Sequence, residues 1–211
     1  LPLDFRRQRQ MCIRDRDIGE HTLHNIVLPP FKAATDAGVR TFMNAFNELN
    51  GIPSTADKML QRDILKGDWG FDGFVVSDWG SLKEMIVHGY AKDKKHAAEL
   101  GVKAGSDMDM ESYIYLTELE SLIENGHVAI EQIDDAVRRI LTIKYELGLF
   151  DDPFHYCDTI REQEITGSPE IREGALEMAK KSIVLLKNAE ATLPLKKEGQ
   201  TIAPVSYTHL R

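Results

Sequence analysis

Cysteine is scarce in this 211-residue sequence, which contains only Cys12 and Cys157. Two cysteines cannot build a framework of several disulfides, and they offer no paired-cysteine zinc site. Long apolar runs are absent too, since no uninterrupted segment approaches the ~20 residues that span a bilayer. The sequence therefore indicates neither a disulfide-stabilised scaffold nor a membrane-spanning chain.

An excess of positive charge is also missing. The chain has 26 Lys and Arg against 34 Asp and Glu, which gives a formal net charge of -8 at pH 7. Nucleic acid and anionic membranes would repel such a surface on average, so neither is expected as a partner. With 42% hydrophobic and 28% charged residues, the composition is that of an ordinary globular protein. The length suits one domain, or one domain with part of another.

Several motifs of cofactor and acyl chemistry do not occur. There is no Gly-rich phosphate loop and no Gly-x-Ser-x-Gly elbow. The seven histidines show no metal-ligand spacing and are interpreted as solvated surface residues. We expect no cofactor and no bound metal, and the sequence indicates no particular oligomeric state.

The two ends of the chain differ from the rest. Residues 6–16 hold five arginines with neither helical nor strand periodicity. A basic arm for nucleic acid is one interpretation. The string instead resembles translated sequencing-adapter DNA, as does the closing stretch. We therefore predict that residues 1–19 and 204–211 are non-native tails, to be left out of fold reasoning.

The most informative stretch is residues 73–80. Its apolar run Phe74-Val75-Val76 is typical of a strand buried on both faces, as parallel strands in α/β proteins are. Asp78 follows at the carboxyl end of that strand. In a closed α/β barrel this end forms the active face, so Asp78 is predicted to be catalytic. The alternative is that Ser77 or Asp78 caps a helix that begins near Leu82.

Helices and strands alternate around this stretch. A helix is expected from Pro29-Pro30 to Gly38, a strand over residues 39–46, and a helix capped by Ser54 or Thr55. Further predictions are helices at 81–88, 93–104, 112–124 and 130–147 and a short strand at 106–110. This order favours parallel βαβ units, but three strands are fewer than the eight of a closed barrel.

Beyond residue 148 the pattern changes. Residues 149–167 are irregular and aromatic, and are predicted to form a linker. Ser168-Pro169-Glu170 is typical of a helix start, with a cap, a first-turn proline and an acid near the positive end of the helix dipole. A strand is expected at 201–203, so residues 168–203 are predicted to open a second domain.

A second pair of acids competes with Asp78 for a chemical role. Asp107 and Asp109 have the D-x-D spacing with which sugar transferases hold a divalent metal. The alternative function is therefore a metal-dependent sugar-transferring or aldolase-like barrel that uses these two acids, and a further alternative is a non-catalytic fragment. In a strand both carboxylates would face the same side. The alternative is that they cap the next helix or shape the rim of a barrel.

Five blocks in order then resemble glycoside hydrolase family three, in its periplasmic bacterial β-glucosidase branch. They are residues 42–51 (FMNAFNELNG), 69–80 (WGFDGFVVSDWG), 104–110 (AGSDMDM), 145–151 (YELGLFD) and 182–188 (SIVLLKN). The resemblance covers roughly residues 20–203. It implies a retaining β-glycosidase that hydrolyses terminal β-linked glucose or similar sugars.

The resemblance also assigns roles to single residues. It implies that Asp78 is the nucleophile that forms a covalent glycosyl-enzyme, and that Trp79 and Met43 line the sugar pocket. Phe46 stands where many relatives carry a tyrosine whose hydroxyl contacts the nucleophile. That hydrogen bond would be missing in this sequence.

The family's fold is a (β/α)₈ barrel followed by an α/β sandwich domain. By resemblance, the chain is an α/β fragment: residues 20–148 are the C-terminal portion of the TIM barrel, and the linker and the start of the sandwich follow. The acid/base glutamate would lie outside this chain, and the fragment itself is expected to be inactive. The substrate would be an oligosaccharide or aryl β-glycoside, and the full-length parent periplasmic or secreted.

Overall fold

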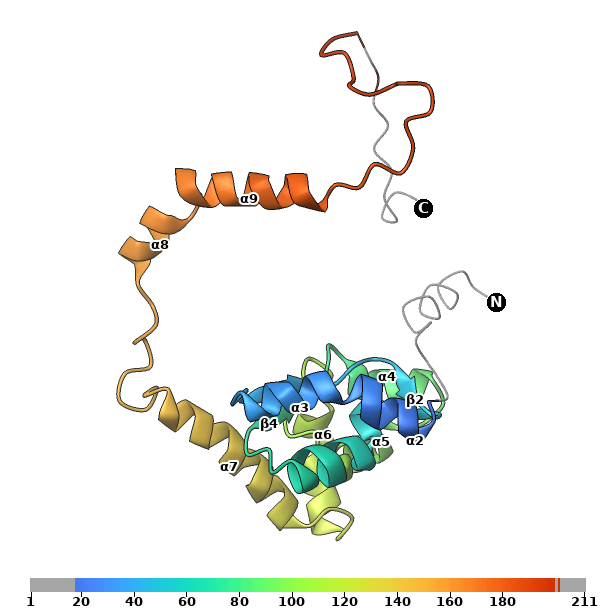
Figure 1. The fold of residues 1–211 in the computed structure, drawn as a ribbon. Coiled ribbons are helices and arrows are strands. Elements are labelled where there is room, and N and C mark those ends of the chain that lie inside the picture. Colours follow the sequence, from blue (N-terminus) through green and yellow to red (C-terminus); the bar gives the residue numbers. More distant parts are fainter. Residues whose placement is uncertain (1–17, 200, 202–211) are drawn as a thin grey trace. The chain divides into compact units, whose positions relative to one another are not determined.

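The computed structural model describes residues 18–199 and 201, and the elements appear in Figure 1. The chain divides between His155 and Tyr156 into two compact units. The first unit holds all of the strands that the structure describes. Each unit is described here by itself.

A short parallel sheet lies at the centre of the first unit. Strand β1 (Thr41–Met43) pairs with β4 (Phe74–Val76), with Thr41 opposite Phe74 and Met43 opposite Val76. The segment expected as a third strand at 106–110 forms a single parallel bridge, between Val76 and Met108. The parallel order β1, β4, Met108 brings the carboxyl ends of all three segments to one edge.

The polypeptide enters β1 through helices. These are α2 (Glu20–Thr22), η1 (Leu23–Val27, a π-helix) and α3 (Pro29–Asp36). Helix α3 begins at the expected prolines, where an absent N–H costs nothing, and Gly38 follows its end with a φ of 86°. The predicted helix is confirmed, and the strand expected over 39–46 is present in its central part.

A tight hairpin follows β1. Strands β2 (Glu48–Leu49) and β3 (Ile52–Pro53) pair antiparallel across Asn50 and Gly51, both of which have positive φ. Asparagine and glycine are the residues that tolerate this conformation best. The hairpin leads the chain from the carboxyl end of β1 back toward the next helix.

That helix begins later than the sequence predicted. Ser54–Ala56 form a short 3₁₀ turn, η2, and the helix proper is η3 (Met59–Asp68, a π-helix). Its cap is Asp57, whose Oδ1 accepts a hydrogen bond from the Leu60 N–H at 3.0 Å. The prediction of Ser54 or Thr55 as the cap was wrong, because both hydroxyls bond elsewhere, to Asn47 O and to Ser81.

Four helices complete the first unit: α4 (Ser81–Val87), α5 (Lys94–Ala104), α6 (Ile114–Glu124) and α7 (Ile130–Glu146). Asp93 caps α5 by accepting from His96 N–H, as the predicted start of that helix requires. The largest core cluster lies among α4, α5 and α6. Its fully buried members include Leu82, Ala97, Ile114 and Leu122. The predicted helices are confirmed to within two residues at their ends.

Two helices lie in the described residues of the second unit. Helix α8 (Thr159–Ile165) lies inside the stretch that was expected to be an irregular linker. Helix α9 (Pro169–Ser182) begins as predicted, with Ser168 Oγ accepting from Ile171 N–H and proline at the first position. Of the strand expected at 201–203, residues 202 and 203 lie outside the described residues, as do residues 1–17 of the expected tail at 1–19 and the whole expected tail at 204–211.

Within the described part of the chain, no helix has the length and apolar character needed to cross a membrane.

Candidate active site

Asp78 follows β4 at the carboxyl edge of the sheet. Its side chain is half-buried, and its Oδ1 accepts a hydrogen bond from the Trp79 N–H at 2.6 Å. Gly80 then turns the chain into α4 with a φ of 67°, a conformation that glycine adopts without strain. The structure thus places the predicted nucleophile at the end of a parallel strand with one carboxylate oxygen held by the backbone.

The helix-cap alternative for this stretch is not what the structure shows. The residue that precedes α4 is Gly80, and no side chain caps that helix. Ser77 Oγ accepts from Met110 N–H at 2.8 Å, and the Gly80 N–H donates to Met110 O at 2.7 Å. These bonds join the Asp78 loop to the segment after Asp107, so they shape the sheet edge rather than the helix start.

The three predicted sugar-contacting residues differ in position. Trp79 is 64% exposed beside Asp78, and Met43 is 54% exposed at the end of β1, the strand next to β4. Phe46 is half-buried in the bend between β1 and the hairpin. The sheet register therefore brings Met43 and Asp78 to the same edge, and Phe46 follows three residues beyond Met43.

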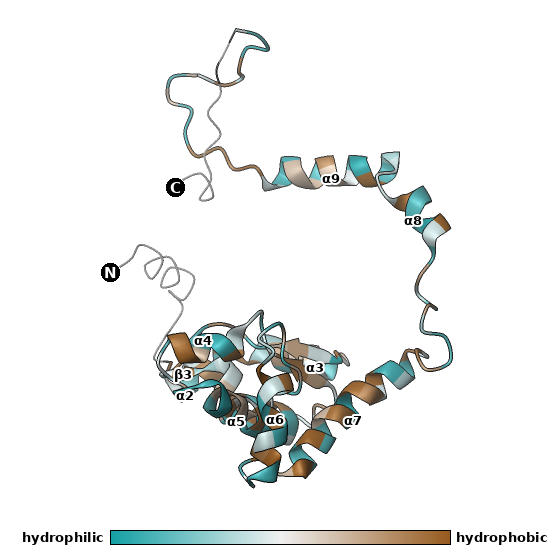
Figure 2. Cartoon of the chain, turned by 180° about the vertical axis from the view of Figure 1, so that it is seen from behind, coloured by the Kyte–Doolittle hydropathy of each residue, from teal (hydrophilic) through white to brown (hydrophobic). Residues whose placement is uncertain are grey.

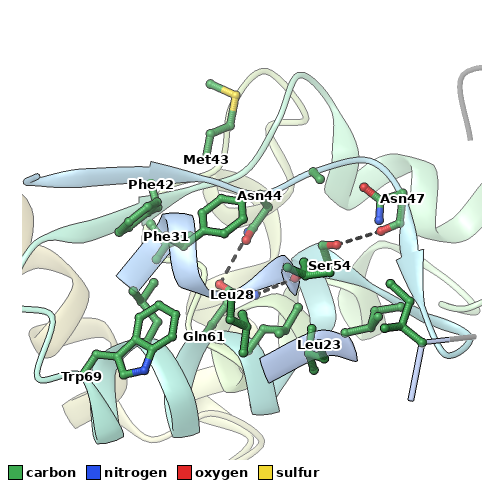
Figure 3. A pocket seen from close by; sticks show the side chains of 17 residues that line it. Leu23, Leu28, Phe31, Phe42, Met43, Asn44, Asn47, Ser54, Gln61 and Trp69 are labelled. Carbon is green, nitrogen blue, oxygen red and sulfur yellow. Dashed lines mark hydrogen bonds between the residues drawn. The ribbon is translucent and has the colours of Figure 1, made fainter. Parts of the chain in front are cut away.

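An apolar hollow of about 250 Å³ lies against β1, η1, α3 and η3. Figure 3 shows Phe31, Phe42 and Trp69 lining it, while Met43 projects to the other side of β1 from Phe42, as alternation along a strand requires. Asp78, Trp79 and Phe46 are not among its lining residues. Met43 and Asn44 do line it, so the hollow reaches the carboxyl end of β1, while Asp78 itself is not part of its lining.

The acids of the D-x-D pair are both engaged by protein groups. Lys66 Nζ lies 2.7 Å from each oxygen of Asp107 and 2.8 Å from Gly105 O. Asp107 Oδ2 also accepts from the Val75 N–H at 2.8 Å. The Lys66 and Asp107 side chains are 5% and 1% exposed, so this ion pair is buried.

Asp109 serves the start of α6. Its Oδ2 accepts from the N–H groups of Ile114 at 2.8 Å and Tyr115 at 3.2 Å, and Oδ1 bonds to Ser112. These are N–H groups that a helix start leaves without intrahelical partners. Of the two interpretations of this pair, the structure fits the capping of the following helix and the shaping of the sheet edge.

A buried hydrogen-bond network links the strand ends, and sequence reasoning missed it. Asn44 Nδ2 donates to Ser106 Oγ at 2.7 Å, and Ser106 Oγ bonds to Gln61 Oε1 at 3.0 Å and Thr55 O at 3.0 Å. Thr55 Oγ1 lies 2.9 Å from Ser81 Oγ at the start of α4. Figure 3 shows Asn44 and Gln61 pointing toward each other. The sequence signal was present at Asn44, the polar residue that directly follows β1.

The negative charge of Asp78 affects the pKa of a carboxyl group on α4. Burial raises the pKa of Glu84 above its ordinary value, and the negative charge of Asp78 adds to the rise, while His88 opposes it. Five of the six histidines that the structure describes are exposed and His96 is half-buried, in line with the expected surface role. Among the described residues, no group of three or more His, Cys, Asp or Glu could hold a metal ion.

Known proteins resemble this chain in sequence and in fold. The periplasmic beta-glucosidase of Salmonella typhimurium is 44% identical over 192 residues, which cover 90% of this chain and 25% of that protein. A beta-xylosidase of Formosa agariphila is 43% identical over 188 residues, covering 85% of this chain and 26% of that protein. The beta-glucosidase of Listeria innocua, solved with glucose, superposes with a TM-score of 0.73 at 41% identity, covering 87% and 25%.

The chain thus spans about a quarter of the length of the curated relatives that it matches. The family model described as "Glycosyl hydrolase family 3 N terminal domain" matches residues 13–143, more than half of the chain. An α/β arrangement with parallel strands, shared with solved β-glucosidases, agrees with this match. The chain belongs to glycosyl hydrolase family 3.

Proposed function

We propose that this chain is part of a retaining β-glycosidase whose nucleophile is Asp78. The observation that carries the proposal is the position of Asp78, half-buried after the central parallel strand β4 with Oδ1 held by the Trp79 N–H at 2.6 Å. The carboxyl edge of parallel strands is where α/β barrels perform chemistry. A carboxylate fixed there can attack a bound substrate.

The chemistry follows from a carboxylate in that position. Asp78 attacks the anomeric carbon of a β-glycoside, the bond to the leaving oxygen breaks, and a glycosyl ester forms on Asp78. A protonated acid outside this chain gives its proton to the leaving oxygen. The resulting carboxylate then takes a proton from a water molecule that attacks the same carbon; the ester bond to Asp78 breaks, and the sugar leaves with its original configuration.

The sugar pocket is proposed to be lined by Trp79 and Met43. Phe46, three residues after Met43 in the bend that follows β1, is proposed to line it as well. An exposed indole next to the nucleophile is a platform for the apolar C–H face of a sugar. Met43 ends the strand adjacent to β4, so its thioether stands at the same edge. Since Phe46 has no hydroxyl, Asp78 receives no hydrogen bond from that position.

The proposed substrate is an oligosaccharide or aryl β-glycoside with a terminal glucose or similar sugar. Support comes from the solved β-glucosidase of Listeria innocua, described in complexes with laminaribiose and with glucose. The β-xylosidases among the relatives extend the class to xylose. Because one relative is named a periplasmic β-glucosidase, a periplasmic or secreted parent is proposed.

The proposed architecture divides the chain as its sequence pattern does. Residues 20–148 are the C-terminal portion of a (β/α)₈ barrel, 149–167 the linker, and 168–203 the start of an α/β sandwich domain. Residues 1–19 and 204–211 are non-native tails. The break between His155 and Tyr156 falls inside the proposed linker, which supports the division.

The decisive experiment uses the complete reading frame that contains this chain. Brief exposure to a 2-fluoro β-glucoside with a good leaving group should trap the glycosyl ester, and a peptide containing Asp78 should carry the added mass. Asp78→Ala should reduce turnover by several orders of magnitude, because the covalent route is lost. Added azide should then yield a glycosyl azide of inverted configuration.

Asp78→Ala should leave folding intact, with a stability change within roughly 1 to 2 kcal/mol, the size of a lost cap. EDTA should leave turnover unchanged, because Lys66 and the α6 N–H groups already occupy the carboxylates of Asp107 and Asp109. Labelling at Asp107 or Asp109 in an Asp78→Ala variant that is still active would end the proposal.

A further inference from the structure

Asp107 bonds to the backbone of β4 at Val75. The Val75 N–H donates to Asp107 Oδ2 at 2.8 Å, and Val75 O accepts from the Asp107 N–H at 2.8 Å and from the Met108 N–H at 3.1 Å. Val75 is 1% exposed and lies three residues before Asp78. On the side of β4 that faces away from β1, Asp107 therefore contributes to the placement of the strand close to the nucleophile.

Asp107 is in turn fixed by Lys66 of η3. Lys66 Nζ donates to both carboxylate oxygens at 2.7 Å and to Gly105 O at 2.8 Å, so all three ammonium protons have acceptors. The two side chains are almost fully buried. A buried carboxylate that loses its cation is costly, and it relieves the cost by moving or by taking up a proton.

We propose that Lys66 is a positioning residue for the reaction, holding Asp107, and through it β4, so that the Asp78 carboxylate meets the anomeric carbon. The inference rests on the proposed function. Lys66 touches no substrate; it acts through the contacts Lys66–Asp107 and Asp107–Val75 and through the two residues of chain that join Val75 to Asp78. Displacements near 1 Å at a reacting carboxylate are enough to cost large factors in rate.

The experiment tests the charge of Lys66, which depends on the charged and titratable groups around the ammonium. Burial lowers the pKa of Lys66 to about 8, the attraction of Asp107 raises it, and Arg62 and Arg139 lower it. Arg62 lies on η3 with Lys66, and Arg139 and Asp135 face the cluster from α7. From α6, the buried Tyr115 hydroxyl donates to Ser106 O at 2.8 Å. The arginines keep their charge throughout the accessible pH range.

The experiment measures how fast the enzyme made from the complete reading frame is labelled by 2,4-dinitrophenyl 2-fluoro-β-glucoside, from pH 6 to pH 10. Dinitrophenolate leaves without a proton, so the acid of the mechanism does not enter this rate. The wild-type rate should fall at least tenfold between pH 7 and pH 10, as Lys66 loses its charge. Lys66→Arg should keep the charge and vary less than twofold over the same range.

Lys66→Met should label at least tenfold more slowly than wild type already at pH 7. The matched control is Lys58→Met, because Lys58 precedes the same helix and pairs with Asp63 at the surface; it should follow wild type at every pH. A Lys66→Met variant that labels as fast as wild type at pH 7, or a Lys66→Arg profile that falls like the wild type, would overturn the inference. If Lys66→Met does not fold, the Lys66→Arg profile decides alone. Wild type that never labels would contradict the proposed function instead.

Discussion

Lys66 carries its charge at a position where burial works against the charged form. Its pKa in the folded protein is about 8, whereas a lysine in an unfolded chain has its ordinary value of 10.5. Between these two values the unfolded state binds more protons than the folded state. Stability therefore rises with pH across that window, and the cost of the buried charge is fully present below pH 8.

We therefore expect the stability and the labelling rate to move in opposite directions above pH 8. In urea denaturation, the midpoint of wild type minus the midpoint of Lys66→Arg should increase between pH 8 and pH 10. Expressed as a difference in free energy of unfolding, the increase should be at most about 1.4 kcal/mol per pH unit. A residue with a structural role alone would give activity and stability that fall together. A midpoint difference that decreases over this range would show that the lysine gains, rather than loses, proton affinity on folding.

At the scale of elements, β1 and β4 approach so closely at their start that only glycine fits. A Cβ on Gly73 would lie 2.0 Å from Arg40 O and 2.6 Å from Phe71 Cζ. Arg40 O accepts from the Phe74 N–H at 3.2 Å, the first bond between the strands. Arg139 adds bonds to the carbonyls of Phe71 and Gly73. The start of β4 therefore has backbone on one side and a guanidinium on the other.

Gly73→Ala should destabilise the first unit by about 3 kcal/mol or more, because a backbone carbonyl cannot move aside as a flexible side chain can. Thermal unfolding followed by circular dichroism would measure the loss. Gly174→Ala is the control, since nothing lies within 4 Å of a Cβ there and the site is inside α9. It should raise helix stability by roughly 0.5 to 1 kcal/mol. Equal effects at the two glycines would refute the close approach.

The helices and strands that were predicted well are those whose signals lie in residues adjacent in sequence. Proline at Pro29 and Pro169 marks the starts of α3 and α9, and the apolar run before Asp78 marks β4. The start of η3 was misplaced because a 3₁₀ turn moves the first helical residue three positions and passes the cap to Asp57. A short-range pattern does not distinguish among several capping residues in a row.

The candidate site was predictable in part for the same reason. The position of Asp78 follows from its own strand, but the Lys66–Asp107 pair joins residues 41 positions apart. The expected strand at 106–110 is reduced to one bridge because the Asp107 carboxylate, rather than a backbone carbonyl, takes the Val75 N–H. A D-x-D spacing draws attention to the acids but does not say which cation they meet.

At the scale of the whole chain, much apolar surface stays exposed in each unit. In the first unit the stripe of α7, visible in Figure 2, includes Val137, Leu141 and Tyr145, which are 43% exposed or more. Strand β1 pairs on one side only, within the part of the chain that the structure describes. Residues 183–186 of the second unit, Ile-Val-Leu-Leu, are 63% to 93% exposed. Exposed β-branched runs and unpaired edges favour association.

The 211-residue chain expressed alone should therefore self-associate, as light scattering after size-exclusion chromatography would show. Charges on alternate positions of the extended run, Ile183→Lys with Leu185→Lys, should lower the associated fraction, because charge on a strand opposes edge-to-edge pairing. Ile160→Lys on α8 is the control: its side chain is 70% exposed, yet it lies in a helix that cannot extend a sheet, so a single charge there should change association little. A wild-type chain that stays monomeric and melts cooperatively would show instead that these apolar surfaces are covered within one molecule.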